Sequence, residues 1–185
     1  IEAGIECRVF HGLSITTLVT GAIGLSNYRF GRQTTLTYPY GGWVATSPLE
    51  TIALNRFTGL HTMALLDLDP TGLGTGDQRP MAPSDAVEAI ALMREKIEQG
   101  LFEREFSNDS PSDMMMKEAL HSFVAEDVHI MRVVLCSDMG TDDQTIVSTT
   151  VEGLRSQAGG RLNCLVFPAA TGEVEEKALL RWAQE

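Results

Sequence analysis

Apolar and polar positions alternate along this chain with two different periods, and the changes of period divide it into short helices and strands. Between residues 85 and 99, apolar side chains recur every three or four positions, which is typical of a helix with one buried face. Nearly continuous apolar runs elsewhere predict buried strands. These patterns predict strands at 5–10, 34–38, 61–68, 130–136 and 161–167, and helices at 15–20, 48–58, 85–99, 113–125, 143–156 and 173–184.

Capping residues support several of these boundaries. Pro48 suits the first turn of a helix, because its missing N–H would be unpaired there anyway. Gly59 follows at the position where a residue in the left-handed conformation commonly ends a helix. Asp142 and Asp143 precede the predicted helix at 143–156, and we expect them to cap it.

Strands that alternate with helices predict an α/β fold, in which helices cover the faces of a sheet. A glycine-rich segment at 21–31 separates the first predicted helix from the strand at 34–38, and we interpret this segment as a linker. We therefore expect residues 1–32 to be the C-terminal end of a first α/β domain with its linker. Residues 33–185 are then expected to form a second α/β domain with a mixed sheet.

Composition narrows the classes of function. With 43% hydrophobic residues, the 185-residue sequence is that of a globular protein. The formal net charge of −11 argues against nucleic-acid binding through phosphate contacts. No uncharged apolar run reaches the roughly 18 residues of a membrane-spanning helix, so we expect no membrane span.

The cysteines suggest structural thiols. Cys7, Cys136 and Cys164 have no CxxC spacing, and the last two lie inside apolar, strand-like runs. We expect these two to be buried free thiols, as in a reducing cytoplasm. Histidines and cysteines are scattered rather than clustered, which disfavours a zinc site.

Three loops that follow predicted strands are candidates for ligand binding, because ligands bind at the carboxyl ends of strands in open α/β sheets. The segment 11–15 enters a helix, and a simple capped turn is the alternative interpretation. The glycine-rich segment 72–77 has no Walker lysine and no helix directly after it, so we interpret it as a surface loop. Asp138 is either a turn residue or a metal ligand or general base.

Three sequence words together resemble one enzyme family: YRFGR at 28–32, GLHT at 59–62 and LLDLD at 65–69. They resemble the archaeal and eukaryotic diphthine synthases, which are S-adenosylmethionine-dependent methyltransferases acting on a modified histidine of translation elongation factor 2. The resemblance implies a tetrapyrrole-methylase fold, a cytoplasmic homodimer and a further N-terminal third that precedes this chain. Tyr38, Tyr40 and Trp43 are candidate anchors for the dimer interface.

The resemblance also implies where the methyl donor binds. Ser14 and Ile15 match the family's Ser-Ile contact with the donor, and Leu66 matches a residue of the adenosine pocket. Met139 matches a glycine turn whose backbone meets the adenine. We therefore expect S-adenosylmethionine to bind between the two domains, with these four residues around it.

One family position departs from the pattern. The family places a histidine near the cofactor about four residues after a proline, and here that slot is Thr171 or Gly172. No Ser–His–Asp or Cys–His arrangement is visible, and no metal is expected. Methyl transfer needs neither, because the sulfonium is already electrophilic and the enzyme mainly aligns the amine and excludes water. No residue stands out as the proton acceptor.

Two alternatives remain. A precorrin methyltransferase would share the fold and the donor, although the YRFGR and GLHT words favour a diphthine synthase. A non-catalytic dimerisation or binding module is the alternative from a different class.

Overall fold

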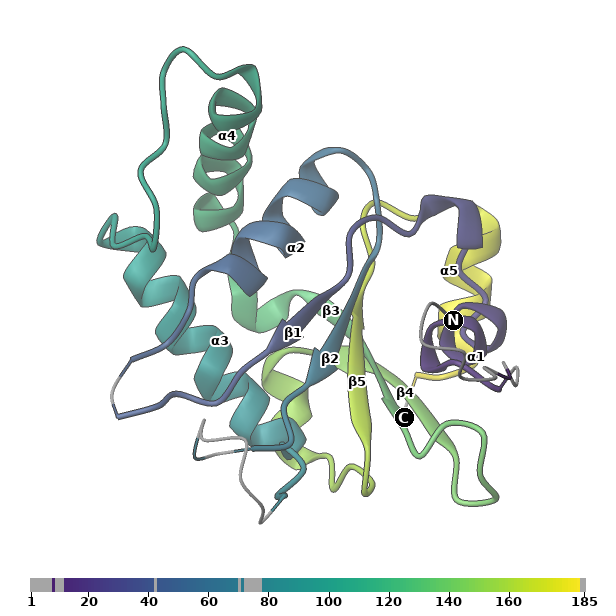
Figure 1. Cartoon of the computed structure of the whole chain (residues 1–185). Coiled ribbons are helices and arrows are strands. Elements are labelled where there is room, and N and C mark those ends of the chain that lie inside the picture. Colours follow the sequence, from purple (N-terminus) through teal and green to yellow (C-terminus); the bar gives the residue numbers. More distant parts are fainter. Residues whose placement is uncertain (1–7, 9–11, 42, 70, 72–77, 184–185) are drawn as a thin grey trace.

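The computed structural model describes residues 8, 12–41, 43–69, 71 and 78–183. Its centre is a five-stranded mixed sheet with the strand order β1-β2-β5-β3-β4 (Figure 1). The first pair, β1 and β2, is parallel, and every other neighbouring pair is antiparallel. The strands are β1 (Thr34–Leu36), β2 (Thr62–Leu66), β3 (Arg132–Ser137), β4 (Thr145–Thr150) and β5 (Asn163–Phe167).

Helices cover both faces of this sheet, so the expected α/β fold with a mixed sheet is confirmed. One face carries α2 (Ser47–Phe57) and α3 (Pro83–Glu98), with α4 (Pro111–Ala125) packed outside them (Figure 1). The other face carries α1 (Ile15–Ala22) and α5 (Glu173–Leu180). The described part of the chain also contains three short 3₁₀ helices: η1 (Asn27–Arg29), η2 (Val128–Ile130) and η3 (Glu152–Ser156).

The alternation of side chains along β3 separates two apolar cores. Val133 and Leu135 point into the larger core, under α2 and α3. Val134 and Cys136 point into the smaller core, under α1 and α5. Because both faces are covered, the interior strands are apolar at nearly every position, as their sequences predict.

The predicted helix at 143–156 is wrong. Residues 145–150 form β4, which pairs with β3 along its whole length, and only 152–156 coil into a short 3₁₀ helix. The run TIVSTT is rich in β-branched residues, which fit a pleated surface better than a helix. Asp142 and Asp143 accordingly lie in the β3–β4 turn and cap no helix. The predicted strand at 5–10 falls almost wholly outside the described residues.

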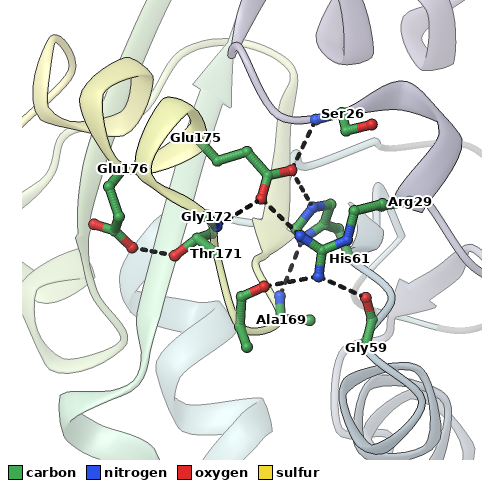
Figure 2. A network of polar contacts seen from close by, with 10 residues as sticks. Ser26, Arg29, Gly59, His61, Ala169, Thr171, Gly172, Glu175 and Glu176 are labelled. Atoms are coloured by element: carbon green, nitrogen blue, oxygen red, sulfur yellow. Dashed lines mark hydrogen bonds and ion pairs between the residues drawn. The ribbon is translucent and has the colours of Figure 1, made fainter.

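A buried carboxylate joins three distant segments of the chain (Figure 2). The Oε1 atom of Glu175, on α5, accepts hydrogen bonds from the backbone N–H of Ser26 at 3.0 Å and from His61 Nε2 at 3.1 Å. Its Oε2 atom accepts from Arg29 Nη1 at 2.7 Å and from the N–H of Gly172 at 3.2 Å. The segment after α1, the start of β2 and the first turn of α5 are thereby held together.

The two basic partners of this carboxylate, Arg29 and His61, also form hydrogen bonds with other segments of the chain. Arg29 Nη2 also donates to the carbonyl oxygens of Gly59 and Ala170, at 2.9 and 2.7 Å. His61 is fully buried, and its Nδ1 accepts the backbone N–H of Ala169 at 3.0 Å. The ring proton is therefore assigned to Nε2, which donates a hydrogen bond to Glu175. Both ring nitrogens of His61 are thus used within the scaffold, and the YRFGR and GLHT words meet in this network.

Asn55, on α2, forms hydrogen bonds with residues of the same two words. Its side chain accepts the backbone N–H of Arg32 and donates to the carbonyl of Arg32 and to Thr62 Oγ1, the last at 2.9 Å. A Cβ atom on Gly31 would overlap the Asn55 amide, so glycine is required at that position. Gly59 has a φ of 77°, which confirms its predicted role after α2.

Replacing Glu175 with alanine is expected to lower the free energy of unfolding by about 3 kcal/mol, because it leaves the buried His61 N–H and the partly buried Arg29 without their acceptor. Urea titration monitored by circular dichroism measures the change. Glu173→Ala is the matched control on the same helix, since that side chain is 81% exposed and pairs only with Lys177 across one turn. Equal effects of the two substitutions would contradict a central role for Glu175.

Acid is expected to destabilise the fold in two steps. Burial lowers the pKa of His61 below its ordinary value of 6.5, against the opposing influence of the Glu175 carboxylate. The unfolded state therefore takes up a proton near pH 6.5 before the folded state does, and stability falls as the pH drops below that value. Burial opposes ionisation of Glu175, but its hydrogen bonds hold its pKa below 4.5, so a second loss follows below that pH.

The measurement is the free energy of unfolding at pH 7.5 and pH 5.5, for the unaltered protein and for His61→Gln. The variant should lose less stability over this interval, whatever its stability at pH 7.5. Equal losses would show that His61 does not account for the first step.

Candidate functional site

A cavity of about 410 Å³ opens at the edge of the sheet where β2 and β3 end and β5 begins. This is the carboxyl end of two strands that run in the same direction, the position where open α/β sheets bind ligands. Its volume lies within the range of roughly 300–1,000 Å³ that is usual for small-molecule sites. The lining residues are Leu13, Ile15, Leu18, Leu65, Leu66, Leu68, Asp138, Met139, Gly140, Thr141, Leu162, Asn163 and Cys164.

Three of the four residues expected around the methyl donor line this one cavity. Ile15 comes from the start of α1, Leu66 from the end of β2 and Met139 from the turn after β3. Ser14, the fourth, is the exposed N-cap residue of α1 and is not among the lining residues. Its hydroxyl lies 2.9 Å from Thr16 Oγ1, and both of its chain neighbours, Leu13 and Ile15, line the cavity.

The start of β5 contributes a wall that the sequence patterns did not reveal. Leu162, Asn163 and Cys164 all line the cavity, because β5 lies between β2 and β3 in the sheet. A strand at 161–167 was predicted, but its place in the strand order was not. Only knowledge of that order would have brought these residues to the site.

Asn163 is the polar residue that shapes this wall. Its Oδ1 accepts hydrogen bonds from Ser137 Oγ at 2.7 Å and from the backbone N–H of Gly160 at 2.8 Å. Its Nδ2 donates to the carbonyl oxygens of Met81 and Gly160, at 3.2 and 3.1 Å. The amide thereby connects the start of β5 to the end of β3 and to the segment that enters α3.

The turn at 138–141 offers free backbone groups at the cavity. Within the described part of the chain, neither the N–H nor the C=O of Met139 takes part in a hydrogen bond. Gly140 beside it has a φ of 85° and donates its N–H to Gln144 Oε1 at 3.0 Å. One donor and one acceptor on the same residue suit a planar heterocycle with both kinds of group along one edge.

Two thiols lie beneath the cavity. Cys136 and Cys164 are opposite each other on β3 and β5, and both are buried free cysteines, as expected. Its hydrogen bond with Cys164, together with burial, raises the pKa of Cys136 above the ordinary range. The Cys136 thiol is therefore neutral and not a nucleophile, and Cys164, which lines the cavity, forms part of its floor.

A larger cavity, of about 760 Å³, lies at the opposite end of the sheet, where β5 ends. Arg56 and Arg132, which line it, are paired with Glu126 and Glu176 at 2.8 and 2.6 Å. Its charges are therefore largely satisfied from within the protein. We prefer the smaller cavity as the functional site, because it is apolar and gathers residues from three expected contact segments.

The position at which the family has a histidine near the cofactor lies away from the smaller cavity. Thr171 lines the larger cavity and donates to Glu176, and Gly172 donates its N–H to Glu175. Neither residue lines the site that Ile15, Leu66 and Met139 share. The absence of the family's histidine at this position therefore removes no side chain from the smaller cavity.

Other expected features of the site have simpler outcomes. The glycine-rich segment 72–77 lies outside the described residues. Among the residues that the structure describes, no group of three or more histidine, cysteine, aspartate or glutamate side chains is placed to hold a metal ion. In the same part of the chain, no helix has the length and apolar character to cross a membrane.

Comparison with known proteins gives consistent results for family resemblance and fold. The chain is similar to curated diphthine synthases: it is 27% identical to that of Methanocorpusculum labreanum over 183 residues, which cover 98% of this chain and 59% of the relative. It is 44% identical to that of Halorubrum lacusprofundi over 82 residues, which cover 43% of this chain and 30% of the relative. No protein-family model matches the chain.

A solved diphthine synthase structure superposes on 98% of the chain, and on 56% of its own length, with a TM-score of 0.69 at 24% identity. The fold is therefore that of the tetrapyrrole methylases, as expected from the sequence words. Two of the curated relatives match almost the whole of this chain, but the chain spans only 59% of the length of each.

Cys136 and Cys164 are expected to resist thiol reagents in the folded protein and to react once it is unfolded. Both are at most 2% exposed, and the pKa of Cys136 is raised by its bond to Cys164 and by burial. Ellman's reagent tests this in a Cys7→Ser variant, which retains only these two cysteines. Fast reaction without denaturant would show that the cavity floor opens to solvent.

Proposed function

We propose that this protein is an S-adenosylmethionine-dependent N-methyltransferase of the diphthine synthase type. Its substrate is the amino group of the modified histidine of translation elongation factor 2, in the synthesis of diphthamide. The observation that carries the proposal is the single apolar cavity shared by Ile15, Leu66 and Met139, at the carboxyl ends of β2 and β3. The similarity to curated diphthine synthases supports the choice of reaction.

The residues present fit the adenosine part of such a donor. Leucine, isoleucine and methionine side chains line a slot suited to a flat aromatic base, which buries apolar area on both ring faces. The free N–H and C=O of Met139 are a donor and an acceptor for the polar edge of the base. When bound, the donor supplies a methyl group on a positively charged sulfur.

The chain's own residues then bind the donor, orient it towards the amine and exclude water from the site. Leu13 and Leu162, 82% and 59% exposed, flank the cavity with apolar surface that a bound partner would cover. No acid or base in the described residues is poised at the cavity to accept a proton, since the Asp138 carboxylate is engaged by two backbone N–H groups. Alignment of a deprotonated amine with the methyl group accounts for the chemistry expected of such a site.

We further propose that the donor binds between two domains. Leu13, Ile15 and Leu18 come from residues 1–32, the proposed end of the first domain, and the other lining residues come from residues 33–185. The proposed partners are elongation factor 2, whose basic patches would suit a protein of net charge −11, and a second copy of the chain. We propose the cytoplasm as the place of action, where elongation factor 2 works.

The proposed homodimer has one exposed aromatic anchor. Trp43 is 50% exposed, with Lys96 Nζ 5.4 Å from its ring centroid. The side chains of Tyr38 and Tyr40 are used internally, because the Tyr38 hydroxyl donates to Asp85 Oδ2 at 3.2 Å and the Tyr40 hydroxyl donates to Asp67 Oδ2. Of the three expected anchors, Trp43 is therefore the one to substitute in a test of the oligomeric state.

The test of the donor site is titration calorimetry with S-adenosylhomocysteine, the demethylated donor. Leu18→Trp should weaken binding at least tenfold, or about 1.4 kcal/mol, because the side chain lies against Gly140 and a larger ring fills the cavity. Val174→Trp is the control, since Val174 is 80% exposed on α5 and does not line the cavity. Unchanged affinity in a folded Leu18→Trp variant would place the donor elsewhere.

Substrate choice is tested by transfer of a labelled methyl group. Elongation factor 2 that carries the 3-carboxy-3-aminopropyl histidine should be methylated, and a precorrin should not. Methylation of the precorrin alone would support the alternative enzyme of the same fold. Donor binding without transfer to either substrate would favour a non-catalytic module.

A further inference from the structure

Two adjacent loops border one end of the smaller cavity. One is the β3–β4 turn, which contributes Asp138, Met139 and the two residues after them to the lining. The other precedes β5 and contributes Leu162 and Asn163. The two loops together form the wall of the cavity at this end.

Asp138 joins the two loops through both its carboxylate and its backbone. Its carboxylate accepts the backbone N–H of Arg161 at Oδ2, 3.1 Å away, and the N–H of Leu162 at Oδ1, 2.9 Å away. Its own backbone N–H donates to the Leu162 carbonyl at 2.9 Å. One residue of the first loop therefore makes three hydrogen bonds to two residues of the second.

The backbone of Asp138 is held in an uncommon conformation. Its φ of 50° lies in the left-handed region, and no other described residue except glycines has a positive φ. The Asp138 carbonyl accepts hydrogen bonds from Thr141 N and Oγ1, at 3.1 and 2.8 Å. On the adjacent loop, a Cβ atom on Gly160 would overlap the Asp138 carboxylate, so glycine allows the close approach.

We propose that Asp138 is a positioning residue for the methyl donor, one that joins the two loops of this wall and holds the peptide groups of Met139 in place. This inference rests on the proposed function, because it concerns the same cavity. The physical reason is preorganisation: a turn already held by hydrogen bonds has less freedom to lose when a ligand binds. The Asp138 carboxylate acts through the two loops and touches no reacting atom.

Asp138→Gly separates the bonds from the backbone conformation. Glycine adopts a positive φ without strain, so the turn can still form, but both side-chain hydrogen bonds are lost. We expect S-adenosylhomocysteine to bind about tenfold more weakly to this variant. Asp138→Asn also tolerates a positive φ and keeps one acceptor oxygen, so its affinity should fall between those of the glycine variant and the unaltered protein.

Calorimetry at a temperature where every variant is folded measures these affinities. Asp142→Gly is the matched control, because it removes an exposed aspartate from the same turn and does not line the cavity. In the transfer assay, Asp138→Gly should raise KM for the donor while leaving kcat at saturating donor unchanged. A purely structural role would lower the melting temperature without this change in KM.

The outcomes distinguish the inference from the proposed function. If the unaltered protein binds S-adenosylhomocysteine and Asp138→Gly binds it equally well, the positioning role is wrong and the donor site stands. A loss as large in Asp142→Gly as in Asp138→Gly would also overturn the role, because it would reflect the turn's charge or general flexibility. If the unaltered protein does not bind the ligand, the proposed function fails, and the role of Asp138 fails with it.

Discussion

The Glu175 carboxylate holds the fold together at the point where three segments far apart in sequence meet. A buried carboxylate is stable only when its oxygens are fully hydrogen-bonded, and here two backbone N–H groups, Arg29 and His61 satisfy them. The segment that leaves α1 is one of the three. Because α1 supplies Ile15 and Leu18 to the cavity, one wall of the candidate site depends on a contact at the other end of the sheet.

Local sequence patterns predict most of the elements but not their arrangement. The apolar run at 61–68 and the Pro48 and Gly59 boundaries correspond to β2 and α2, since burial and capping act within a few residues. β4 was missed because its six residues lie between an acidic turn and a 3₁₀ helix, a context that favours a helix in the pattern. Its strand identity comes from pairing with β3, which is a non-local interaction.

The same limit decides how much of the site could be predicted. Ile15, Leu66 and Met139 were expected from a family resemblance, and the structure brings them to one cavity. Cys164 and Asn163 carry no local signal, because their position at the site follows from the insertion of β5 between β2 and β3. Asp138 lies in a turn, one of the interpretations that its sequence context allows, but its bonds to the adjacent loop depend on that same strand order.

Two of the three words that carry the family resemblance act in the scaffold, whereas the third, LLDLD, supplies Leu65, Leu66 and Leu68 to the cavity. Arg29 and His61 belong to YRFGR and GLHT, and both bind Glu175, far from the cavity that gathers Ile15 and Met139. Polar networks of this kind demand particular residue types, because a missing partner leaves a buried group unsatisfied. Apolar cavity walls tolerate swaps of similar volume, so they place weaker demands on residue type than the polar network does. A resemblance based on scaffold words therefore specifies the fold more strongly than the ligand. The proposal of a methyl donor therefore rests on the cavity's lining and on the Met139 peptide groups, which take part in no hydrogen bond among the described residues.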